Sequence, residues 1–196
     1  MKKLFITLIV LLFIVSSVKS QSKYTDAEWN KLVGFLSAEQ WGDANTLSLQ
    51  ILKRIPAAEI DSDDAAAFRY MYIYSEAGLM NERKVTKEQA QKKITPHIGH
   101  KVLLAAHPIT SKQGFNSITL VNDKTDTLMV TATNKTATQI FSFEYIIPKK
   151  RFPLDEFKNN EGKFYGVIGR IKSIKAGGDM FPRFQIYVDE AEMVAR

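Results

Sequence analysis

The segment from 163 to 194 has the pattern of two long β-strands joined by a Gly-Gly turn. Apolar and polar side chains alternate over Lys163–Lys175 and Arg183–Val194, as they do in strands with one buried face. Gly177-Gly178 supplies the backbone freedom for a tight reversal. Strict alternation puts these side chains of the first strand on opposite faces: Phe164, Ile168 and Ile174 on one, Tyr165, Val167 and Ile171 on the other. Gly166 and Gly169 predict a bulge or bend, and a bent strand with a hairpin partner favours a small barrel.

Before Gly99 the apolar residues recur at helical spacing, which predicts a helical region over residues 21–98. Capping boxes are predicted at Thr25–Glu28 and Ser37–Gln40, and Thr86 is expected to cap a shorter helix. The acids of 61–64 are interpreted as the start of a helix. A calcium loop would need glycine and glutamate where Ala66 and Tyr72 stand.

The spacing of Ala44 and Pro56, followed by a tyrosine-rich helix, resembles the second helix of a tetratricopeptide repeat. Ser48 departs from the pattern, because the repeat usually has an aromatic residue there. The resemblance implies a scaffold for protein interactions, and any antiparallel helix pair would give the same spacing.

From Gly99 the apolar period changes to two, and residues 99–196 are predicted to form five or six strands. The expected strands before the terminal hairpin are Lys101–Ala106, Phe115–Val121, Thr127–Thr133 and Gln139–Ile147, followed by a helical turn at 153–157. Gly166-x-x-Gly169-Arg170-Ile171 and the terminal strand 186–194 resemble an OB-fold barrel of the anticodon-binding type. The predicted fold class is therefore α+β, with antiparallel helices followed by an OB-like barrel. Another small barrel or an open sheet would also fit.

The first 20 residues have the three parts of a secretory signal peptide. Lys2 and Lys3 are followed by Leu4–Val15, which is apolar apart from Thr7, and then by small and polar residues up to Ser20. We expect export to the periplasm or the medium, with Gln21 as the first mature residue. No later segment is apolar enough to cross a membrane.

Composition removes several classes of function. The 196 residues include no cysteine, which excludes disulfides, thiol catalysis and cysteine-ligated metals. Loss of Lys2, Lys3 and Lys19 with the signal would lower the formal net charge from +6 to +3, which is small for a nucleic-acid binder. No P-loop, dinucleotide fingerprint or serine-nucleophile motif is present, so no cofactor and no catalytic residue are predicted.

A basic stretch with interleaved aromatic residues is the one candidate binding site. Its predicted ligand-binding residues are Lys149, Lys150, Arg151, Arg170, Lys172 and Tyr165. The alternative interpretation is a solvated loop with core aromatic residues. His97, His100 and His107 are interpreted as ordinary histidines rather than as a metal site, because Pro96 and Gly99 interrupt any helix that would align the first two.

Three functions remain open. The first is an exported, non-enzymatic binding or scaffold protein whose partner is another exported or envelope protein. The second is an OB-type binder of an anionic polymer, such as an acidic glycan, although nucleic acid is not the expected partner of an exported chain. The third is a hydrolase that uses carboxylate or histidine side chains without a recognisable motif.

Overall fold

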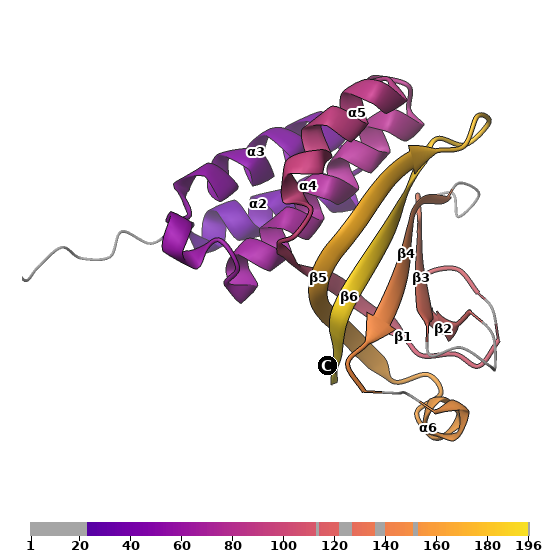
Figure 1. The fold of residues 1–196 in the computed structure, drawn as a ribbon. Helices are drawn as coiled ribbons and strands as arrows, with labels where there is room; N and C mark the ends of the chain where they lie inside the picture. The colour runs from indigo at the N-terminus through magenta and orange to yellow at the C-terminus, as the bar shows by residue number, and fades with distance from the viewer. Residues whose placement is uncertain (1–22, 113, 122–126, 136–139, 151–152, 196) are drawn as a thin grey trace, which may run out of the picture.

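The computed structural model describes residues 23–112, 114–121, 127–135, 140–150 and 153–195, without the side chains of 140–143 (Figure 1). The predicted signal peptide, residues 1–20, and Arg151 lie outside these ranges. The chain is an α+β protein, with helices in its N-terminal half and a curled six-stranded sheet in its C-terminal half. This confirms the predicted class and the order of helices and strands.

Within the described residues, four α-helices precede the sheet. They are α2 (Asp26–Ser37), α3 (Trp41–Arg54), α4 (Asp63–Asn81) and α5 (Lys87–Ile94), with 3-10 turns at η1 (Ala57–Glu59) and η2 (Thr95–His97). The capping box at Thr25 is confirmed, and Thr86 forms another with Gln89. The box predicted at Ser37–Gln40 is wrong: Ser37 is still the last residue of α2, and α3 begins without a side-chain cap.

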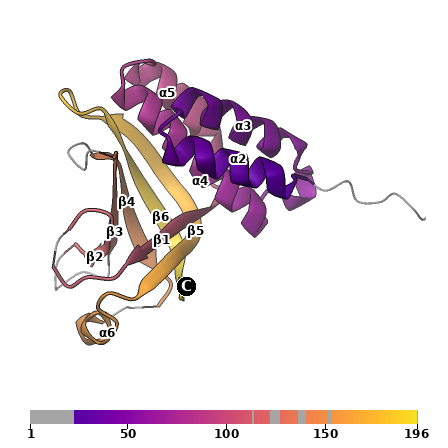
Figure 2. The ribbon, with the colours of Figure 1, turned by 180° about the vertical axis from the view of Figure 1, so that it is seen from behind.

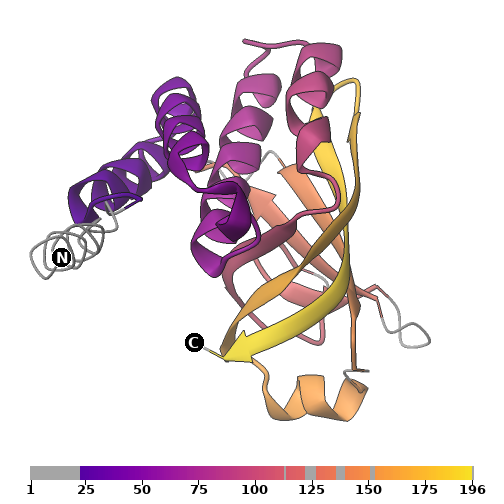
Figure 3. The same cartoon turned by 60° about the vertical axis from the view of Figure 1, so that its left-hand side comes forward.

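The sheet contains β1 (Lys101–Pro108), β2 (Ile118–Leu120), β3 (Leu128–Thr133), β4 (Ile140–Pro148), β5 (Phe164–Gly177) and β6 (Arg183–Ala195). A short helix, α6 (Leu154–Asn159), lies between β4 and β5. The strand order is β1-β5-β6-β4-β3-β2, and among the strand pairs of the described residues only β4 and β6 run parallel. The helices lie along one side of the sheet (Figure 2), where α4 packs against β1 and α5 lies beside β5 (Figure 3).

The sheet is a half-barrel rather than the predicted barrel, because its two edge strands do not pair along their length. Beyond the end of β1, Ile109 forms a single bridge with Ile118 of β2. At the start of β1, side chains from the turn before α4 and from α4 itself occupy the free edge instead of a strand. The N–H of Lys101 donates to Asp61 Oδ1 at 3.0 Å, and its carbonyl accepts from Arg69. The helices thus satisfy backbone groups that a closed barrel would pair between strands.

Irregularities in β5 and β6 correct the alternation predicted for the terminal hairpin. The pairing shifts between Ile171 and Ser173, so Ile174 is buried with Ile171 rather than facing away from it. Phe164, expected on the face of Ile174, is 52% exposed. In β6, Glu190 has a φ of 52°, and Val188 and Ala191 are both buried although they are three residues apart. Both features are typical of β-bulges, which also increase the bend of a strand.

Candidate functional site

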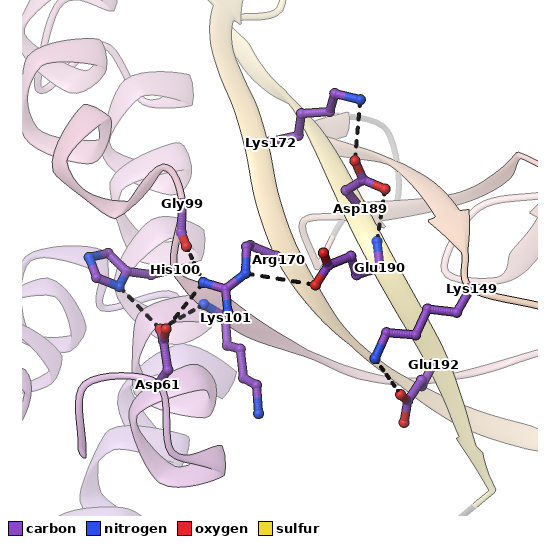
Figure 4. Close-up of polar contacts among 10 residues, drawn as sticks. All are labelled: Asp61, Gly99, His100, Lys101, Lys149, Arg170, Lys172, Asp189, Glu190 and Glu192. Carbon is purple, nitrogen blue, oxygen red and sulfur yellow. Dashed lines mark hydrogen bonds and ion pairs between the residues drawn. The ribbon is translucent and has the colours of Figure 1, made fainter. Parts of the chain in front are cut away.

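The predicted basic residues on β5 and beside β4 lie on the solvent-facing side of the sheet (Figure 4). The side chains of Arg170, Lys172 and Lys149 are 40%, 59% and 51% exposed. Lys150 is also exposed, and Arg151 lies outside the described residues. The fold thus brings Lys149 near the β5–β6 hairpin.

Carboxylates pair with three of these cations, Lys149, Arg170 and Lys172. Lys172 Nζ lies 3.2 Å from Asp189 Oδ2, and Lys149 Nζ lies 2.7 Å from Glu192 Oε1. Arg170 contacts two acids. Its Nη1 lies 3.1 Å from Asp61 Oδ2, and its Nε lies 3.9 Å from Glu190 Oε2. Arg170 also donates to the carbonyl of Gly99.

A hollow of about 430 Å³ on this face has no excess of positive charge in its lining. Three cations and three acids line it: Lys101, Lys149, Arg170, Asp63, Glu190 and Glu192. A polyanion bound there would have to compete with the carboxylates that already pair with Lys149 and Arg170. The geometry therefore offers the anionic-polymer function little support.

Aromatic rings beside these charges are mostly unavailable for stacking on a ligand. Tyr165 is partly buried and packs against the core. Tyr187 stacks on Tyr145, with 5.0 Å between ring centroids and 15° between ring planes. Phe164 is exposed. A site that stacks bases or sugars needs free ring faces. The stacking of Tyr145 on Tyr187 covers one face of each ring.

The three histidines have separate environments. His97 packs edge-on against Tyr72, with ring centroids 5.2 Å apart, and burial lowers its pKa to about 4, with Arg69 and His100 acting in the same direction. His100 Nδ1 lies 3.1 Å from Asp61 Oδ1. His107 lies at the far end of β1. Within the described residues, no three histidine, aspartate or glutamate side chains are grouped to hold a metal ion.

The His100–Asp61 pair resembles part of a catalytic arrangement, but its surroundings are structural. Among the hydrogen bonds of the described residues, none joins His100 to a serine or threonine hydroxyl. Asp61 instead accepts from Lys101 and Arg170. The hydrolase hypothesis thus finds no nucleophile beside this pair.

A second, apolar hollow lies between the helices and β1, where the half-barrel is open. It measures about 380 Å³. The helical wall consists of Trp29, Leu36, Ala67, Tyr70, Met71 and Tyr74, and the sheet side consists of Leu103, Leu104, Ala105, Ala106, His107, Asn116 and Ala132. We call this hollow the seam groove. Ala105 and Ala106 are exposed, so their small side chains leave its mouth open.

Groups with shifted pKa values gather in the seam groove. Burial, and then the nearby Glu144 carboxylate, raise the pKa of both Tyr70 and Tyr74 well above the usual value. The pKa of His107 is lowered, because the effect of burial outweighs a backbone hydrogen bond with Asn116 that acts in the opposite direction. His107 Nε2 is buried without a hydrogen-bond partner. In the neutral tautomer that carries its proton on Nδ1, Nε2 has a lone pair that can accept a hydrogen bond.

The sequence gives few signals for the seam groove. Its residues come from α2, α4, β1 and β3, and no spacing in the sequence relates these elements. The tyrosine-rich helix noted in the sequence is α4, and its Tyr70 is buried. The same helix, α4, also lines the seam groove because the sheet does not close beside it.

Comparison with protein-family models, curated proteins and solved structures finds no match to this chain. Among the described helices, none has both the length and the apolar character required to span a membrane.

Proposed function

We propose that this protein is a non-enzymatic binding protein whose site is the seam groove. The observation that carries the proposal is the combination of an apolar lining with one buried, unpartnered acceptor, His107 Nε2. Small-molecule sites are commonly hollows of about 300–1,000 Å³ at the mouths of barrels, lined by aromatic residues with a few polar groups that orient the ligand. Groups with shifted pKa values support the same location.

The lining specifies the class of ligand. Trp29, Met71 and Leu103 favour an uncharged apolar body, because no cationic or anionic side chain is among the lining residues. His107 Nε2 favours a single hydroxyl or N–H donor on that body. A ligand of about 10 to 17 non-hydrogen atoms at about −0.3 to −0.5 kcal/mol per atom would bind with a dissociation constant from roughly millimolar to micromolar.

The other expectations stay proposals. Export by residues 1–20 would place the groove in the periplasm or the medium, and intact mass measurement of the secreted protein should give Gln21 as its first residue. The likeness of the helices to tetratricopeptide repeats and of the sheet to an OB-fold supports a binding role by analogy alone.

N-phenyl-1-naphthylamine tests the proposal, because it is an uncharged aromatic body with one N–H donor. Its fluorescence should rise saturably on addition of the protein. Ala105→Phe places a ring in the mouth of the groove and should weaken binding at least tenfold. Val33→Phe adds the same ring at a position on α2 that is 39% exposed and outside the groove, and should change affinity less than twofold. Equal affinities of the two variants, or no saturable binding, would refute the proposal.

A second variant tests the role of His107. His107→Phe removes the acceptor and keeps an aromatic ring, so it should weaken N-phenyl-1-naphthylamine by about three- to tenfold, the usual value of one hydrogen bond. The affinity for 1-phenylnaphthalene, a hydrocarbon without the N–H, should stay within twofold. A similar loss of affinity for both probes would show that His107 contributes only through the packing of its ring and not as a hydrogen-bond acceptor.

A further inference from the structure

The turn of the β5–β6 hairpin carries two exposed apolar side chains at a protruding end of the molecule (Figures 1 and 2). Met180 is 73% exposed and Phe181 is 46% exposed. Contacts with the helices hold this turn in place. Asn81 Nδ2 donates to the carbonyl of Pro182 at 3.4 Å, and Lys87 Nζ lies 2.8 Å from Asp179 Oδ1. The apolar side chains thus stand on an anchored turn.

Positive charge surrounds the turn. Arg83, Lys87 and Pro182 line one shallow hollow beside it. Lys84 follows Arg83 at the end of α4, and Lys175 and Arg183 flank the turn on the two strands. Against these five cations stand three acids, Glu82, Glu88 and Asp179. Glu82 pairs with Lys84 at 2.7 Å and Asp179 with Lys87, so the local charge remains positive.

We propose that this end of the molecule docks on an anionic lipid surface. Met180 and Phe181 would enter the boundary between head groups and acyl chains, while Arg83 and Lys175 contact the anionic head groups. Lys84, which pairs with Glu82, adds to the positive potential of the tip. A convex tip with two apolar side chains presents far less area than the roughly 1,000 Å² that a stable protein interface needs. A lipid surface, by contrast, deforms around the tip. This inference is independent of the seam groove.

Sedimentation with sucrose-loaded vesicles tests the proposal. The chain should bind vesicles of equal parts phosphatidylglycerol and phosphatidylcholine at least tenfold more strongly than vesicles of pure phosphatidylcholine. Met180→Ser with Phe181→Ser should lower that binding about tenfold. The matched control is Phe115→Ser with Phe164→Ser, which removes two rings that are 59% and 52% exposed elsewhere. It should change binding less than twofold. Every variant carries the same residues 1–22, so the comparison isolates the hairpin.

A charge-reversal pair tests the cationic part. Arg83→Glu with Lys84→Glu should lower binding at least tenfold, because each cation near an anionic surface contributes roughly fivefold. The control pair, Lys31→Glu with Lys158→Glu, reverses two exposed charges elsewhere. It should lower the logarithm of the vesicle affinity by less than half as much.

Tryptophan fluorescence gives an independent test. In Phe181→Trp, the emission should shift to the blue with anionic vesicles and stay unchanged with soluble heparin. Equal losses in test and control pairs, no preference for anionic vesicles, or an equal shift with heparin would overturn the proposal.

Discussion

At the scale of single residues, Asp61 joins the helices to the sheet (Figure 4). Its Oδ1 accepts from the Lys101 N–H and lies 3.1 Å from His100 Nδ1, and its Oδ2 accepts from Arg170 at 3.1 Å. Burial alone would raise the pKa of Asp61, but these hydrogen bonds outweigh it and lower the pKa to about 2. The carboxylate therefore favours the folded state.

Replacing Asp61 should destabilise the protein. We expect Asp61→Asn to lower the free energy of unfolding at pH 7 by about 1–3 kcal/mol, the usual cost of losing hydrogen bonds to a charged group. Because the folded pKa lies below that of the unfolded chain, this contribution is present above pH 4 and disappears as the pH falls toward 2. Urea denaturation measures the change. Glu190→Gln, which removes the more distant partner of Arg170, should cost less than about 0.5 kcal/mol.

His97 predicts a second pH dependence. Its pKa is about 4 in the folded protein and near 6.5 in an unfolded chain, so between these values the unfolded state binds more protons. The contribution of His97 to the free energy of unfolding should be complete above pH 6.5, fall by up to about 3 kcal/mol as the pH drops to 4, and change no further below that pH. Urea midpoints of the wild type and His97→Gln across this range provide the test. An identical slope in both proteins would contradict it.

At the scale of elements, Gly169 lets β5 and β6 approach closely at the bend. A Cβ at this position would lie 2.5 Å from Val188 Cγ1, 2.9 Å from the carbonyl oxygen of Asp189 and 3.2 Å from Ala191 Cα. Two of these three atoms belong to the backbone of β6 and cannot move without disturbing the pairing. The glycine predicted to mark a bulge or bend is thus required by its neighbours across the hairpin.

Gly169→Ala should therefore destabilise the protein by about 1–3 kcal/mol, the usual cost of overpacking. Gly34→Ala provides the opposite case. It lies inside α2, a Cβ there would meet nothing within 4 Å, and alanine should stabilise the helix by about 0.5–1 kcal/mol. Thermal denaturation of the two variants gives the comparison. A stable Gly169→Ala protein would show that the strands can separate at the bend.

Local chemistry was predictable from the sequence, and contacts between distant segments were not. The cap at Thr25 depends on Glu28 three residues away, so its pattern is visible in the chain. Ser37 and Gln40 have the same pattern, but α2 continues through Ser37, so this serine cannot cap α3. The pattern itself does not show where the preceding helix ends. The role of Asp61 depends on residues 39 to 109 positions away. The seam groove likewise follows from the open edge of β1.

At the scale of the whole molecule, side chains of the helices replace missing strand partners. Arg69 is fully buried and donates to the carbonyls of Ile60, at 2.6 Å, and Lys101. Gln91 of α5 acts similarly beside β5. Its Nε2 donates to Ile174 O at 2.9 Å, and its Oε1 accepts from Ala176 N at 2.7 Å. Without the helices, the backbone groups of Lys101, Ile174 and Ala176 would lose these partners.

The two halves should therefore unfold together. In urea, far-UV circular dichroism, which follows the helices, and near-UV circular dichroism, which follows the packed aromatic residues, should give one coincident transition. Gln91→Leu, which cannot bond the edge of β5, should shift both curves equally to lower urea. Two separate transitions, or a shift of one curve alone, would show that the halves are independent.

The measurement that most directly tests the proposed binding site is a methyl NMR titration with N-phenyl-1-naphthylamine. Methyl groups of Leu36, Met71 and Leu103 line the seam groove, whereas Met180 lies at the hairpin turn and Leu128 lies in the core of the sheet. We predict that the first three shift together and saturate with one dissociation constant, while Met180 and Leu128 stay unchanged. Largest shifts at Met180, or small shifts spread over all five residues, would contradict the assignment of the groove as the binding site.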